Sequence, residues 1–100
     1  MATGWLVGVM VELAEEPWPV RHFFAVGVED RAQAEWKAID GAQRIGNVAM
    51  SPIGGLEPVH AIGELSARTI SAQGLRPGEI RPLGRQAPRL WTTVGRAPPG

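Results

Sequence analysis

A chain of 100 residues, with ten acidic and ten basic side chains and no cysteine, is long enough for one domain with a modest core. The lack of cysteine excludes disulfides, thiol catalysis and thiolate metal sites. The charges are unevenly placed, because residues 1–64 hold nine acids and four bases whereas residues 65–100 hold one acid and six arginines. This asymmetry predicts an acidic folded part followed by a basic segment.

Two strands joined as a β-hairpin are predicted over about 4–13 and 20–29. Trp5–Val11 is apolar on both faces, which indicates a strand inside a sheet. Residues 20–28 place their most apolar side chains at every second position, and the short connection before them contains Pro17 and Pro19. A lone hairpin is marginal in water, so further strands are expected. The apolar run is too short to span a bilayer and no basic residue precedes it, which favours a cytoplasmic protein without membrane contact.

A first helix is predicted over about 30–44. Asp30 is a good N-cap, and Gln33 follows it at the spacing of a capping box. Ala32, Trp36 and Ile39 recur at helical spacing and predict the face that covers the sheet. Trp36 is therefore expected to fill the space between helix and sheet, in preference to stacking on a cofactor.

Later elements are predicted from turn and helix signals. Residues 46–51 are either a short third strand or a packed loop, and we favour the strand. A second helix is predicted over about 58–73, because Pro58 suits a first helical turn and Gly74 a helix end. After this helix, Pro77 and Pro82 lie five residues apart and exclude another regular helix. Glu79–Leu83 is therefore expected to be extended, as a short edge strand.

These elements predict an α+β fold, a two-layer sandwich in which an antiparallel sheet that starts with the hairpin is covered on one face by two helices. The single domain is expected to span residues 1–83. Residues 84–100 are rich in proline, glycine and arginine and are expected to form a flexible basic tail, in which Leu90–Val94 is a brief run of strand-forming residues.

Candidate catalytic and metal-binding residues are few. His60 and Glu64 would share a face of the second helix, and His22 could complete a set of metal ligands. Nothing in the sequence brings the three together, so an ordinary helix-surface pair is favoured. His22 is the best candidate for a general base, although a histidine at the edge of the core with a backbone partner is the favoured interpretation. We predict no catalytic residue, cofactor or metal.

An interaction module is the leading functional hypothesis. Leu6, Met10 and Phe23 would form an apolar patch on the second face of the sheet, and such a patch invites burial in a homodimer formed by stacked sheets or paired edges. Trp18 and Trp91 have no place in a periodic core face, and tryptophan is enriched among residues that anchor interfaces. Folding back onto their own domain is the alternative for both tryptophans.

Nucleic-acid binding is the second hypothesis. Arginine side chains could pair with phosphates while Trp91 offers a stacking surface. The candidate residues are Arg76, Arg81, Arg85, Arg89 and Arg96. They are spread along the chain, which is neutral as a whole, so self-association ranks above nucleic acid. A small-ligand or metal-dependent enzyme that uses His22, His60 and Glu64 is the third hypothesis.

Overall fold

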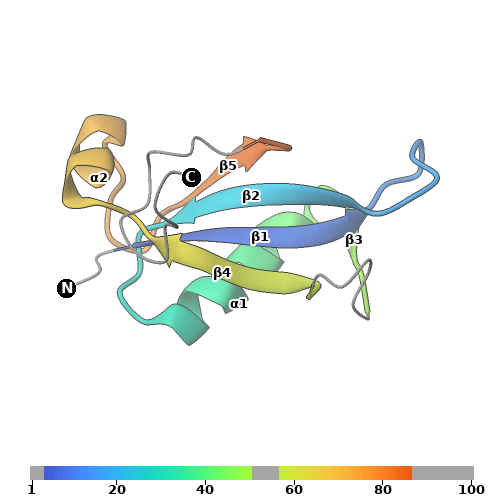
Figure 1. Ribbon diagram of the computed structural model, residues 1–100, viewed down its shortest axis with the longest axis horizontal. Coiled ribbons are helices and arrows are strands. Elements are labelled where there is room, and N and C mark those ends of the chain that lie inside the picture. Colours follow the sequence, from blue (N-terminus) through green and yellow to red (C-terminus); the bar gives the residue numbers. More distant parts are fainter. Residues whose placement is uncertain (1–3, 51–56, 87–100) are drawn as a thin grey trace, which may run out of the picture.

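The fold is described by a computed structural model over residues 4–50 and 57–86 (Figure 1). This part of the chain forms a mixed α+β fold in which five antiparallel strands make one sheet and two helices pack beside it. The predicted fold class and the N-terminal hairpin are confirmed. The elements in chain order are β1 (Trp5–Glu12), β2 (Val20–Val26), α1 (Arg31–Gln43), β3 (Asn47–Val48), β4 (Val59–Glu64), α2 (Ala67–Gln73) and β5 (Ile80–Gly84).

The strand β1 is the centre of the sheet. It pairs with β2 on one side, and on its other side it pairs with β4 along most of its length and with β3 at its end. The strand β5 pairs with the far side of β2. A strand with a neighbour on each side and a layer over each face needs apolar side chains at nearly every position, which explains the unbroken apolar run of β1.

Helix α1 covers one face of the sheet with a stripe of small residues. Asp30 caps its start by accepting a hydrogen bond from the Gln33 N–H at 2.9 Å. The buried face consists of Ala34, Ala38 and Ala42, which pack against a cluster that includes Val7, Val9, Val11, Phe24 and Val26. Because the valines and Phe24 supply the bulk, small helix residues let the two layers approach closely.

The prediction that Trp36 fills the helix–sheet space is wrong. Trp36 lies on the outer side of α1 and is 69% exposed. The prediction placed the largest apolar side chains of the helix on the face that packs against the sheet. The space above Phe24 is too narrow for them, since a Cβ added at Gly41 would lie 3.2 Å from the Phe24 ring.

The predicted helix over 58–73 is wrong in its first half, where β4 lies. Val59, Ala61 and Gly63 alternate along β4, and this strand supplies the second neighbour that β1 requires. The helix α2 starts only after Ser66, whose side chain accepts a hydrogen bond from the Thr69 N–H at 3.0 Å. It ends as predicted at Gly74, which adopts a left-handed φ of 62° that suits glycine.

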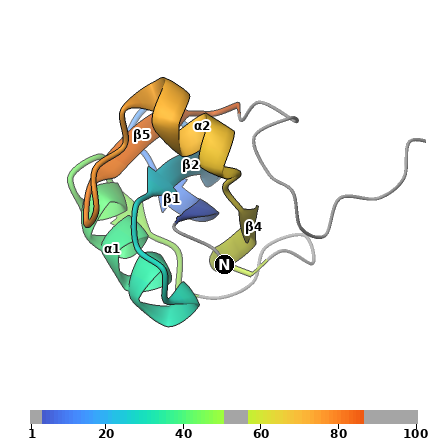
Figure 2. The ribbon, with the colours of Figure 1, turned by 90° about the vertical axis from the view of Figure 1, so that its left-hand side faces the viewer.

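The two helices lie on opposite faces of the sheet, not on one face as predicted (Figure 2). Opposite α1, a second cluster buries Leu6, Ala25, Leu65 and Leu75, and Ile70 of α2 packs against it. Figure 2, in which the sheet is seen end on, shows α1 and α2 on its two sides.

The remaining short strands agree with the sequence. β3 is a two-residue strand within the range favoured for it, and β5 is an edge strand that contains Pro82. The folded part continues past residue 83, because β5 ends at Gly84 and the Arg85 side chain pairs with Glu16. Leu90–Val94 and most of the expected tail lie outside the described residues.

Candidate interaction surface

The loop between β1 and β2 presents the most prominent candidate for a contact with another molecule. It projects beyond the end of the sheet, at the right of Figure 1. Trp18, between Pro17 and Pro19, is 76% exposed in this loop. It therefore does not fold back over its own domain. Two flanking prolines fix their own φ angles and restrict the residues before them, so they limit the conformations of the loop.

An ion pair links this loop to the end of the neighbouring edge strand β5. The Arg85 guanidinium donates a hydrogen bond to Glu16 Oε2 at 2.9 Å, across 69 positions of sequence. Glu16 stands two residues before Trp18, and Arg85 directly follows β5. A surface pair of this kind contributes little stability, about 0–1 kcal/mol. The ion pair instead restrains the position of the loop beside the end of β5.

The apolar patch predicted on the second face of the sheet is closed by the chain itself. Leu6 is 4% exposed and Met10 is 6% exposed, and Phe23 is partly buried beside the cluster under α2. Leu6 and Met10 are thus unavailable for stacking against a second sheet. Self-association stays a prediction, and these two residues no longer support it.

Arg21 covers the part of this face that α2 does not reach. Its guanidinium carbon lies 5.3 Å from the centre of the Phe23 ring, in cation–π geometry. The side chain lies across Gly8, where an added Cβ would stand 2.6 Å from the Arg21 Nε. A long arginine stem can cover apolar surface while its charged end meets water. Periodicity along β2 cannot indicate this role, because it marks a charged residue only as polar.

The arginines proposed for nucleic acid are partly neutralised where the structure describes them. Arg81 pairs with the Glu79 carboxylate at 3.1 Å and also donates to the Gln73 carbonyl oxygen. The Arg76 N–H donates to the same carboxylate, and this hydrogen bond, followed by the one from Arg81, lowers the pKa of Glu79. Arg85 is held by Glu16 as described above.

The other members of that set, Arg89, Arg96 and Trp91, lie outside the described residues. In the described segments, the candidate arginines do not gather into a stripe of uncompensated positive charge. Arginines that already pair with carboxylates of the same chain offer fewer contacts to phosphates than the number of arginines in the sequence suggests.

The three candidate metal ligands are kept apart by the sheet. His22 is opposite Val9 in the β1–β2 ladder, and His60 is opposite Gly8 in the β1–β4 ladder. Neighbouring positions of β1 face opposite sides, so the two histidines lie on opposite faces of the sheet. The expectation that His60 and Glu64 share a helix face is wrong, because both residues are on β4. The described residues contain no group of three such ligands.

His22 lies on the same face of the sheet as α1, near Arg85. Its Nε2 is buried and has no hydrogen-bond partner among the described residues. Burial lowers the pKa of His22 below its ordinary value of 6.5, and the positive charge of Arg85 lowers it further. The neutral imidazole is therefore the form that the fold favours.

Two exposed apolar side chains were missed by the sequence analysis. Trp36 stands on the outer face of α1, and Met50 after β3 is 95% exposed. A hollow at the end of α1 is lined by residues that include Ile39, Val48 and Met50. The signal that could have placed Trp36 outside is the spacing of Ala34, Ala38 and Ala42, a complete helical stripe of small residues.

Comparison of the chain with protein-family models, curated proteins and solved structures found no match. Within the described segments, none of the helices has the length and apolar character needed to cross a membrane.

Proposed function

We propose that this chain is a small non-catalytic interaction module whose contact element is the β1–β2 loop. The observation that supports the proposal is the 76% exposure of Trp18 at a position restrained on both sides. Tryptophan is one of the residue types that are enriched among the side chains that dominate binding energy.

Restraint of the loop supports the same proposal. A contact loop that is already ordered loses little conformational entropy on binding, so more of the contact energy appears as affinity. The flanking prolines and the Glu16–Arg85 pair both restrict the loop in the unbound chain. Glu15 in the same loop is exposed, which adds a negative charge to the loop.

A second copy of the chain is the partner to test first. Sedimentation velocity over a wide concentration range is compared for the wild-type chain and for Trp18→Ala. We expect concentration-dependent association of the wild type, weakened by at least roughly thirtyfold in Trp18→Ala, the loss typical of a dominant interface residue at about 2 kcal/mol.

Trp36→Ala is the matched control, because it removes an equally exposed indole from α1. It should associate like the wild type. A wild-type chain that stays monomeric at the highest concentration, or equal weakening by both substitutions, would contradict self-association through this loop.

A further inference from the structure

One edge of the sheet is formed by β4, and its backbone is oriented so that it could add another strand. In the described residues β4 pairs only with β1. The Met10 N–H donates to the Pro58 carbonyl oxygen at 2.7 Å, so the alternate positions Val59 and Ala61 direct their N–H groups away from β1. A row of outward N–H and C=O groups is a template for pairing with another chain.

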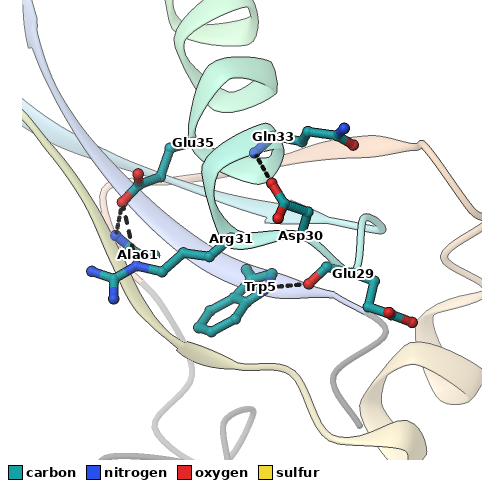
Figure 3. A network of polar contacts seen from close by, with 7 residues as sticks. All are labelled: Trp5, Glu29, Asp30, Arg31, Gln33, Glu35 and Ala61. Carbon is teal, nitrogen blue, oxygen red and sulfur yellow. Dashed lines mark hydrogen bonds and ion pairs between the residues drawn. The ribbon is translucent and has the colours of Figure 1, made fainter.

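A carboxylate from α1 occupies one position of this template. The outward Ala61 N–H donates to Glu35 Oε2 at 3.2 Å, and Figure 3 shows the Glu35 side chain reaching from the helix to the strand. The same oxygen lies 3.7 Å from Arg31 Nε, one helical turn earlier. The carboxylate oxygen therefore takes the place that a carbonyl oxygen of an added strand would take.

The opposite edge of the sheet, formed by β5, is interrupted by another means. The Gly27 N–H donates to the Glu79 carbonyl oxygen at 2.8 Å, so Arg81 is the next residue that bonds to β2 and Pro82 is an outward position. Proline has no N–H to offer there. The register of β5 also shifts between Phe23 and Phe24, which disturbs the edge further.

We infer that Glu35 is an edge guard: its carboxylate occupies the outward Ala61 amide and keeps β4 from pairing with a strand of another copy. Pro82 interrupts the β5 edge through the backbone itself, whereas the interruption of the β4 edge depends on one side chain of a neighbouring helix. Removal of that side chain opens a site for a second copy of the chain. This inference does not depend on the Trp18 loop, because the two surfaces are built from different residues.

Hydrogen exchange and sedimentation of Glu35→Ala test the inference together. At a protein concentration low enough for the variant to be monomeric, exchange of the Ala61 amide should accelerate by roughly tenfold, the change expected from losing one hydrogen bond, while the amide of Val9 stays protected. The variant should also associate with rising concentration more strongly than the wild type does. Glu35→Met serves the same test where Glu35→Ala does not fold, since it keeps the aliphatic stem without an acceptor.

Two controls separate the acceptor from the charge. Glu35→Gln keeps an oxygen that can accept the Ala61 N–H, and it should resemble the wild type in exchange and in association. Asp40→Ala removes an exposed carboxylate from the same helix and should also change neither measurement. Unchanged exchange at Ala61 in Glu35→Ala overturns the inference, and so does faster exchange without increased association.

Discussion

The two faces of the sheet are closed in different ways. On the α1 face, Val7, Val9 and Phe24 meet a stripe of alanines, and the side chains of this cluster are almost fully buried. On the other face, one part lies under α2 and another part is covered by the Arg21 side chain. Close packing between two layers leaves no room for change in volume, whereas long side chains at a surface can rearrange. The first face should therefore be the less tolerant one.

The largest expected difference is between two truncations. Phe24→Ala should lower the free energy of unfolding by about 3–5 kcal/mol, because it leaves a cavity between sheet and helix. Leu75→Ala, in the cluster on the other face, should cost about 2 kcal/mol, near the lower end for such changes, because short α2 can settle into the space. Urea denaturation followed by circular dichroism measures both. Equal costs would show that the two faces are equally rigid.

The next largest effect on stability is expected from a larger side chain in the alanine stripe of α1. Ala38→Leu should lower the free energy of unfolding by about 1–3 kcal/mol, because the added carbons have no space above the sheet. Trp36→Ala, two positions earlier on the exposed side, should stay within about 0.5 kcal/mol of the wild type. Thermal denaturation of the pair checks the orientation of α1. A larger loss of stability for Trp36→Ala than for Ala38→Leu would indicate that Trp36 faces the sheet, as the sequence predicted.

Replacement of the Arg21 cover should have a smaller effect. Arg21→Ala removes the cation–π contact with Phe23 and uncovers Gly8, at a cost of about 1 kcal/mol in urea denaturation. Arg21→Met keeps a long flexible stem and should recover part of that loss. If methionine recovers nothing, the charge of Arg21 and not its covering stem stabilises this face.

The smallest effect is a dependence of stability on pH that comes from His22. Its pKa is lowered in the folded state, so the unfolded chain binds the proton more readily and stability is lost as the pH falls below about 6.5. Urea denaturation at a series of pH values between 7 and 5 should show this loss in the wild type and in His60→Gln. It should be absent in His22→Gln. The same slope in all three chains would assign the loss to other groups.

Local signals in the sequence were sufficient for about half of the architecture. The hairpin followed from two strand patterns and a short proline-containing connection, and Asp30 and Gly74 set one helix start and one helix end as predicted. The same kind of signal failed at Pro58, because proline suits an extended segment as well as a first helical turn. Whether residues 59–64 form strand or helix depends on β1, which requires a second neighbour.

The sequence also indicated some residues of the candidate surface and not others. Trp18 could be identified because no periodic face accommodates a tryptophan between two prolines. The burial of Leu6 and Met10 could not be predicted, since their cover comes from distant parts of the chain and from Arg21. Glu35 was likewise invisible as an edge residue, because its partner is a backbone amide 26 positions later.

The sequence by itself determined the elements whose causes are local: alternation along β2, the capping of α1 and the glycine that ends α2. Only the tertiary structure decided which side of α1 faces the sheet, where β4 lies and how both sheet edges are interrupted. The physical reason is that these features depend on the space between layers and on hydrogen-bonding groups of distant strands, and periodicity along a single segment carries information about neither.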